Sequence, residues 1–316
     1  MTRHILGKGV DEQATLSPVC IMSGRTVSLV LGSGGARGLA HIGVIQWLEH
    51  HGFDIRSIAG TSMGALVGGI YAAGRLPLYT RWATALERRD VIRLLDFSFS
   101  RNSLFKGERV IGELKVLIGN PDIGTLPVAF TAVATDMDSG REVWLNSGPL
   151  FDAIRASMAI PTVFAPYTIQ GRRLMDGGLV NPVPIAPTLA DNTDLTIAVN
   201  LNGEPRSLPP SVEQAEGRRD GGRYRENIAK LINELQHRWG PEAEESGFFD
   251  IVSRSMDIMQ DLISQFKLTA YAPDITVDIP RNVCSFYEFH RASEVIEAGR
   301  YYARQSLRDL AEEGSE

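Results

Sequence analysis

A serine set between two glycines, where a short expected strand is followed by a run of small residues, limits the folds open to this chain more than any other feature. Residues 60–64 read Gly-Thr-Ser-Met-Gly, with a short expected strand at 55–59 before them and a helical pattern at 63–73 after them. A tight strand-to-helix turn forces its serine into a strained backbone conformation and presents the hydroxyl at a helix N-terminus, which favours negative charge. The bare pattern is weak, because about 0.2 matches are expected from residue frequencies. Its flanking elements make Ser62 the candidate nucleophile.

Short apolar runs alternate with amphipathic stretches along most of the chain. Strands are expected at residues 27–31, 55–59, 128–134, 141–145, 172–175, 195–200 and 274–279. Helices are expected at residues 39–51, 63–73, 78–89, 224–239, 248–266 and 291–310. Strands that alternate with helices indicate a mainly parallel sheet covered on both faces. The sequence thus predicts an α/β fold with three layers, α/β/α, around a mainly parallel central sheet.

The chain divides by composition into four stretches. Residues 1–25 have no sustained periodicity and are expected to be a mobile leader. Residues 26–202 carry the alternating pattern and form the expected catalytic core. Residues 203–223 are polar and rich in proline and glycine, which predicts a flexible loop. We expect the helices and the strand of residues 224–316 to pack on the same domain, because 316 residues with 43% hydrophobic content suffice for one large α/β unit.

A cluster of glycines follows the first expected strand and opens the first helix. Residues 32–38 read Gly-Ser-Gly-Gly-Ala-Arg-Gly, so several backbone amides can turn toward one point, as an oxyanion site requires. A dinucleotide-binding loop has similar ingredients, but Arg37 stands where its pattern needs the third glycine, and no acidic residue closes a second strand about twenty residues later. The nucleotide interpretation is therefore disfavoured. Arg37 is expected to brace the loop, with a solvated arginine at the helix start as the alternative.

An aspartate ends another expected strand. Asp176 follows residues 172–175 and is itself followed by Gly177 and Gly178. Polar groups at the carboxyl end of a strand lie where α/β sheets place functional sites. Asp-Gly-Gly alone is usually a turn, but beside the other two strand-end motifs it makes Asp176 a candidate partner for Ser62.

The charge balance and the cysteine content exclude several classes of protein. The chain has 32 basic and 38 acidic residues and a net charge of −6, which argues against a nucleic-acid partner. Cys20 and Cys284 lie far apart without metal-ligand spacing, so neither a disulfide framework nor a cysteine-based zinc site is expected. We expect no metal and no cofactor.

No part of the sequence is expected to cross a membrane. Residues 1–20 carry charges throughout and lack the continuous apolar region of a secretory signal. The longest uncharged run, residues 58–74, is too short and too weakly apolar to span a bilayer. A cytoplasmic protein is expected, and peripheral contact with the inner membrane face stays open.

The three motifs, in this order, resemble those of the patatin-like phospholipase family. Further segments that look like family segments lie at residues 134–141, 156–166 and 176–184. The resemblance is close over residues 27–200 and looser over the C-terminal third, which looks like that of bacterial members. It implies a patatin-like fold and a serine hydrolase that acts on acyl esters.

The resemblance implies a serine–aspartate dyad rather than a triad. Ser62 would attack the ester carbonyl, and Asp176 would take its proton directly. The backbone amides of Gly34, Gly35 and Arg37 would hold the oxyanion, and Ser33 stands where many members have glycine. The glycines expected to support the three motifs are Gly32, Gly38, Gly60, Gly64, Gly177 and Gly178.

A triad with a histidine base is the alternative. An aspartate with its ordinary pKa of about 3.9 is a weak base for a serine hydroxyl, and burial would have to raise that pKa. Only His237 and His290 follow Asp176, and neither lies in a short loop after a strand. His41 follows the glycine loop and is expected to pack rather than to reach the site.

The substrates that the resemblance implies are phospholipids or lysophospholipids. A carboxylesterase or thioesterase acting on soluble acyl esters is one alternative, and a binding or regulatory protein with a silent site is another. Residues 91–106 mix apolar and basic side chains, which favours a connecting loop over a flap that meets acyl chains. The apolar side chains of residues 248–266 are expected to face the core or a second copy in a homodimer, with a lipid-binding wall as the alternative.

Overall fold

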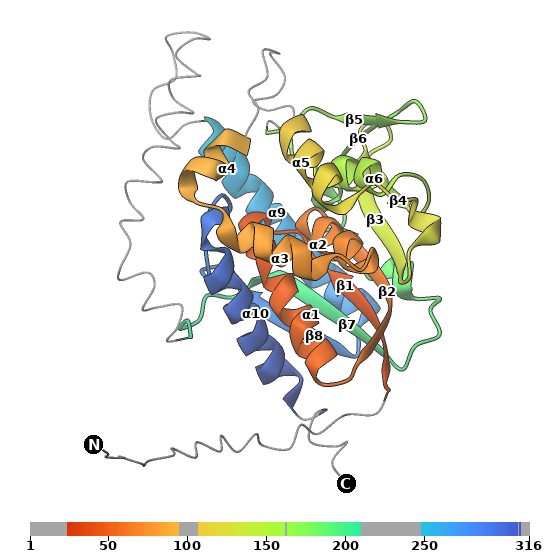
Figure 1. Cartoon of the computed structure of the whole chain (residues 1–316), viewed down its shortest axis with the longest axis vertical. Coiled ribbons are helices and arrows are strands. Elements are labelled where there is room, and N and C mark those ends of the chain that lie inside the picture. The colour runs from red at the N-terminus through yellow and green to blue at the C-terminus, as the bar shows by residue number, and fades with distance from the viewer. Residues whose placement is uncertain (1–23, 95–106, 162, 210–247, 309, 311–316) are drawn as a thin grey trace, which may run out of the picture.

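The computed structural model describes residues 24–94, 107–161, 163–209, 248–308 and 310 (Figure 1). The expected helix at residues 224–239 lies outside these ranges, as do nearly all of the expected leader and most of the expected loop at 203–223. Of residues 91–106, only the first four are described, and they end a short helix.

One sheet of eight strands forms the centre of the fold. The strand order is β5-β6-β3-β2-β1-β7-β8, and β4 also pairs with β3. Strands β3, β2, β1, β7 and β8 run parallel, whereas β4, β5 and β6 join antiparallel. The bounds are β1 Thr26–Leu31, β2 Asp54–Thr61, β3 Ala129–Asp136, β4 Glu142–Leu145, β5 Tyr167–Ile169, β6 Arg172–Asp176, β7 Leu195–Gly203 and β8 Ile275–Pro280. The predicted, mainly parallel sheet is confirmed.

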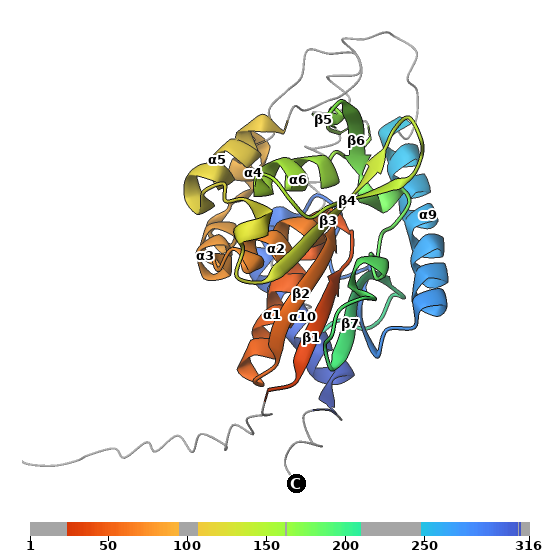
Figure 2. The same ribbon diagram turned by 90° about the vertical axis from the view of Figure 1, so that its right-hand side faces the viewer.

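Helices cover both faces of this sheet. The α-helices are α1 Ala40–His50, α2 Met63–Ala72, α3 Leu76–Ala85, α4 Arg88–Leu94, α5 Glu108–Ile118, α6 Leu150–Ser157, α9 Phe248–Tyr271 and α10 Ala292–Ser306. The 3-10 helices are η1 Gly35–Leu39, η2 Ile123–Thr125, η3 Gly177–Leu179, η4 Ala186–Thr188 and η5 Phe289–Arg291. Figure 2 shows α9 beyond β7, with α1, α2 and α3 on the opposite side of the strands. The predicted three-layer α/β/α fold is confirmed.

The C-terminal part of the described chain completes these layers. β8 pairs with β7 at one edge of the sheet, and α10 packs along α1 and against β8. This packing buries α1 between the sheet and α10, which explains why apolar residues cover most of the circumference of α1. None of the helices in the described ranges combines the length and the apolar content that a bilayer crossing requires.

One expected helix is wrong. Residues 78–89 form parts of two helices, because Leu86 is extended after the end of α3, with φ −67° and ψ 124°. Asp90 then accepts a hydrogen bond from the Glu87 amide at 3.0 Å, which caps the start of α4. The helices α5 and α6 were not expected from the sequence pattern, and α6 contributes to the site described below.

Candidate active site

The sheet brings the three motifs to one place. Leu31, the last residue of β1, pairs with Gly60, so the glycine loop after β1 lies beside the turn after β2. Thr61 pairs with Val133 of β3, and the next residue of β3 pairs with Asp176. Because β6 is antiparallel to β3, the rule about the carboxyl ends of parallel strands does not place Asp176. Asp176 is placed by the length of β6, because this strand ends opposite the part of β3 that also pairs with Thr61, the residue before Ser62.

Ser62 has the strained backbone that the turn predicts. Its φ of 56° and ψ of −120° lie in a region that side chains rarely adopt. Ser62 shares a positive φ with two other non-glycine residues of the described chain, Gln170 and Ala272. Such strain persists only where the surroundings enforce it, and it concentrates at functional sites. The residue is almost fully buried, at 1% exposure.

The two glycines of the motif are required by close backbone approach. A Cβ at Gly60 would lie 2.5 Å from the carbonyl carbon of Gly64, across the turn. A Cβ at Gly64 would lie 2.0 Å from the carbonyl oxygen of Leu31 in the neighbouring strand. The turn is therefore pressed against β1, and this contact fixes where α2 begins.

A buried serine on α6 holds the nucleophile turn from the other side. The Ser62 amide donates a hydrogen bond to the Ser157 hydroxyl oxygen at 2.9 Å. The same hydroxyl donates to the Val133 carbonyl at 2.6 Å. Ser157 was not among the site residues expected from the sequence, although it lies inside the family-like segment at residues 156–166.

Asp176 is buried at the end of β6, with 1% exposure. Its amide donates to the Ala159 carbonyl at 2.9 Å, and its Oδ1 accepts from the Gly178 amide at 2.7 Å. Burial raises the pKa of Asp176 to about 6, and interactions with the Ser62 hydroxyl and the Gly178 amide oppose that rise. Oδ2 is buried without a formed hydrogen bond in the described structure. The carboxyl group thus keeps an unused acceptor oxygen, and the Ser62 side chain is close enough to lower its pKa.

The glycine loop leaves two amides without partners. The amides of Gly32, Ser33 and Ala36 donate to carbonyls of neighbouring segments at 3.1, 2.8 and 2.8 Å. Those of Gly34 and Gly35 donate to no group in the described structure. Gly35 has a φ of +57°, and a Cβ there would lie 2.6 Å from the ring of Phe286. Two adjacent unpaired amides can donate to an anionic oxygen.

The side chain of Arg37 braces the loop. Its Nε donates to the Gly34 carbonyl at 3.2 Å, and one terminal nitrogen lies 3.2 Å from Asp257 on α9. Gly34 is the N-cap of the 3-10 helix η1. In a 3-10 helix each amide donates to the carbonyl three residues earlier, so the backbone amide of Arg37 is directed to the Gly34 carbonyl. The amides of Gly34 and Gly35 are therefore the more available donors. No sequence signal links Asp257 to a loop 220 residues away.

The described histidines lie outside the hydrogen bonds of Ser62 and Asp176. His41 is buried, and its Nε2 donates to the Gly32 carbonyl at 2.8 Å. Burial lowers the pKa of His41 to about 4, so the ring is neutral at pH 7 and supports the glycine loop. His290 accepts a hydrogen bond from Arg88 at 3.3 Å, and His237 lies outside the described residues.

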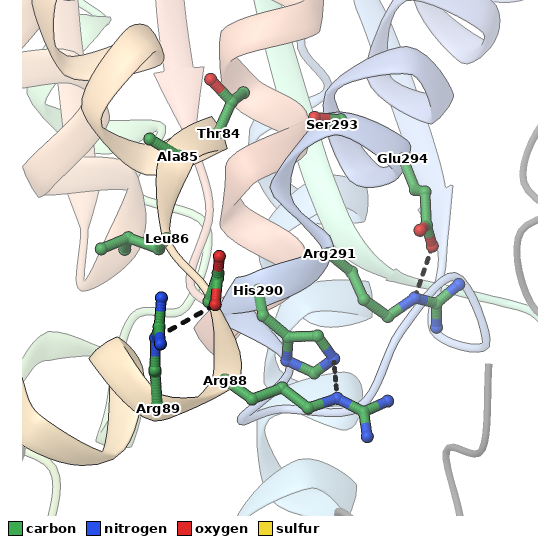
Figure 3. Close-up of a pocket in the computed structure, with 10 residues that line it drawn as sticks. Thr84, Ala85, Leu86, Arg88, Arg89, His290, Arg291, Ser293 and Glu294 are labelled. Atoms are coloured by element: carbon green, nitrogen blue, oxygen red, sulfur yellow. Dashed lines mark hydrogen bonds and ion pairs between the residues drawn. The ribbon is translucent and has the colours of Figure 1, made fainter.

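A cavity of about 730 Å³ opens between the α3–α4 corner and the η5–α10 junction (Figure 3). Neither Ser62 nor Asp176 lines it. Among its charged side chains, Arg291 pairs with Glu294 at 2.7 Å and Arg89 pairs with Glu87 at 3.1 Å. In the described ranges, no group of three His, Cys, Asp or Glu side chains is placed to hold a metal ion.

Comparisons with known proteins gave matches to a family profile, to curated relatives and to a solved structure. Residues 29–189 match the profile described as "Patatin-like phospholipase", a range that includes Ser62 and Asp176. An uncharacterized NTE family protein of Mycobacterium tuberculosis is 40% identical over 89% of this chain and 91% of its own length. A lysophospholipase of Pyricularia oryzae is 27% identical over 93% of this chain and 19% of its own length. The structure of VipD from Legionella pneumophila aligns over 90% of this chain and 67% of its own, with a TM-score of 0.40 and 12% identity.

Proposed function

The chain belongs to the patatin-like phospholipase family, and from this premise we propose that it hydrolyses acyl esters of phospholipids or lysophospholipids with Ser62 as nucleophile and Asp176 as base. One observation carries the proposal. A serine with a strained backbone lies beside a buried carboxylate that has a raised pKa and an unused acceptor oxygen. Perturbed ionisable groups next to a nucleophile are typical of catalytic sites.

The reaction has two steps that balance in protons. In the first step, Ser62 Oγ attacks the acyl carbonyl carbon while Asp176 takes the hydroxyl proton. The ester bond then breaks, the lysolipid or glycerophospho-alcohol leaves with that proton, and the acyl group stays on Ser62. In the second step, water attacks the acyl-enzyme, Asp176 takes the water proton and returns it to Ser62, and the fatty acid leaves.

The environment of Asp176 supports direct proton transfer. A pKa of about 6 makes the carboxylate a stronger base than an exposed aspartate, yet leaves it mostly ionised at pH 7. The Gly178 amide holds Oδ1, which leaves Oδ2 to accept the serine proton. A histidine is not needed to bridge the two groups.

The glycine loop supplies the second half of the chemistry. The carbonyl oxygen becomes negative when Ser62 attacks, and the unpaired amides of Gly34 and Gly35 can donate to it. The first amides of α2 lie next to Ser62 and add the positive end of the helix dipole. Fixed donors of this kind contribute about 3–4 kcal/mol to the transition state. Arg37 holds the loop in shape through Gly34.

Labelling with a fluorophosphonate tests the nucleophile. Wild type should gain one phosphonyl group, detected on Ser62 by peptide mass spectrometry, and Ser62→Ala should gain none. Ser28→Ala is the matched control, because Ser28 is equally buried. Its hydroxyl donates a hydrogen bond to Asp191, which lies just before the start of β7, whereas Ser62 follows the end of β2. Labelling at another serine, or hydrolysis of lysophosphatidylcholine by a folded Ser62→Ala, would contradict the proposal.

A further inference from the structure

Helix α9 packs against the protein with its polar side. Five side chains of its inner face make polar contacts with the body or are buried there: Asp257, Gln260, Asp261, Ser264 and Lys267. Near the end of the helix, Leu268 and Tyr271 add apolar contact with a small cluster beneath the sheet. A helix on a sheet ordinarily buries its apolar side instead.

The opposite side of α9 is apolar and exposed. Ile258, Met259, Leu262 and Phe266 are exposed at 69%, 51%, 54% and 68%. Leu262 lies three residues after Met259 and four after Ile258, and Phe266 lies four after Leu262, so these side chains form one ridge along the helix. For these four side chains, the expectation of a place in the core is therefore wrong, and contact with a second copy stays a prediction. We call the exposed residues of this side between residues 255 and 270 the outer strip: Ser255, Ile258, Met259, Leu262, Gln265, Phe266, Thr269 and Ala270.

Between residues 255 and 270 the outer strip carries no formal charge, and the exposed side chain of Arg254 borders its N-terminal end. The charged residues on this part of α9, Asp257, Asp261 and Lys267, pair with the body instead. Contiguous exposed apolar surface of this kind marks an interaction site. The lack of charge favours a partner that is itself apolar.

The outer strip is too narrow for a stable homodimer. A standard interface takes about 800 Å² and 20–30 residues from each partner, whereas the strip has eight residues on one helix. A lipid surface sets no such minimum, because an amphipathic helix binds by placing a few apolar side chains among the acyl chains.

The same helix touches the candidate active site with its inner face. Asp257 lies 3.2 Å from the Arg37 side chain that braces the glycine loop. The Gln260 amide nitrogen would lie 2.7 Å from a Cβ at Gly178, two residues after Asp176. Since a helix is about 10 Å across, the outer strip lies about one helix diameter from these contacts.

We propose that the outer strip of α9 docks the protein on the surface of a phospholipid bilayer and so sets the active site against the membrane that holds its substrate. The partner is identified through the proposed function, on which this inference rests. The apolar, uncharged character of the strip makes the contact hydrophobic rather than electrostatic.

Vesicle binding tests the docking surface directly. Full-length Ser62→Ala, which should not consume the lipid, is mixed with phosphatidylcholine vesicles, and the bound fraction is measured by flotation. Adding Leu262→Gln and Phe266→Gln should lower the partition coefficient by at least on the order of tenfold. Val116→Gln should leave it unchanged, because Val116 is 89% exposed but lies on α5. Raising salt from about 0.1 to 0.5 M should not release the protein.

Three results would overturn the inference. Absence of vesicle binding is the first, and unchanged binding by the double α9 variant is the second. The third is a dimer in analytical ultracentrifugation that the double variant dissociates, since the strip would then belong to a second copy.

A soluble ester separates this inference from the proposed function. When the two α9 substitutions are made in the active protein, which retains Ser62, it should hydrolyse p-nitrophenyl butyrate at the wild-type rate. It should lose turnover only on vesicles. Soluble-ester hydrolysis without vesicle binding would remove the docking surface and keep the hydrolase. Vesicle binding through α9 without any ester hydrolysis would keep the docking surface and contradict the proposed hydrolase.

Discussion

The hydroxyl of Ser157 accepts a hydrogen bond from the backbone amide of Ser62 at 2.9 Å. It links the end of α6 to the strained turn, and its own proton goes to the Val133 carbonyl. Two residues further on, the Ala159 carbonyl accepts the amide of Asp176 at 2.9 Å. One short segment after α6 therefore holds the backbones of both proposed catalytic residues.

Ser157→Ala should loosen this arrangement. The Ser62 amide would be buried without an acceptor, which costs about 1–3 kcal/mol, and the hydroxyl of Ser62 would lose its fixed position. Urea denaturation should show the lower stability, and kcat should fall more than KM changes. Ser264→Ala is the control, because Ser264 is a buried helical serine that donates to Gln260 instead. Equal effects on kcat from both variants would contradict a positioning role for Ser157.

The rate should depend on pH through Asp176. Only the ionised carboxylate accepts a proton, and its pKa is raised to about 6. We expect kcat/KM to rise with pH and to level off above that value, as measured on a soluble ester. His41→Gln should not move this limb, because the His41 pKa is lowered to about 4. A flat profile between about pH 5 and 8 would contradict Asp176 as the base.

Asp176→Asn should stabilise the protein while it abolishes activity. Burial raises the folded-state pKa, so the stability that protonated Asp176 provides is complete below about 3.9 and is lost as pH rises through about 6. Above that pH, the buried charge costs up to about 3 kcal/mol, and Asn removes it while keeping an acceptor for Gly178. Urea denaturation should show the gain at about pH 8 and little of it at about pH 4. Equal stability of the two proteins at high pH would contradict the assigned burial effect.

Two glycine-to-alanine changes should have opposite signs. Gly64→Ala forces a methyl group to 2.0 Å from the Leu31 carbonyl, so we expect a loss of several kcal/mol, roughly the overpacking range or beyond. Gly112→Ala on α5 meets nothing within 4 Å and should stabilise by about 0.5–1 kcal/mol. Thermal denaturation measures both. A harmless Gly64→Ala would show that the turn is not pressed against β1.

The sheet and the candidate site residues follow from the sequence because short motifs encode them. A strained serine needs small neighbours, and a loop with free amides needs glycine, so Ser62 and the loop at residues 32–38 stand out locally. The pairing of Asp176 with β3 was not predictable in the same way. It depends on the antiparallel direction of β6 relative to β3, which the sequence of residues 172–175 does not reveal.

Contacts between distant segments account for what the sequence did not reveal. Ser157 contacts Ser62 across 95 residues, and Asp257 contacts Arg37 across 220, so no spacing rule finds either pair. The orientation of α9 reverses the usual rule that an apolar face is buried, as the exposure of Phe266 shows. A Gly35→Val variant would be a poor test of the oxyanion site, because the new side chain would meet the ring of Phe286 in the structure.

Hydrolysis of lysophosphatidylcholine by a matched set of variants tests the dyad most directly. The set consists of Ser62→Ala, Asp176→Asn and the single Gln variants of His41, His237 and His290, each checked for folding by circular dichroism. We expect the first two to lose on the order of a hundredfold or more in kcat/KM and each histidine variant to stay within a few-fold of wild type. A histidine variant as inactive as Ser62→Ala, or an active Asp176→Asn, would contradict the dyad.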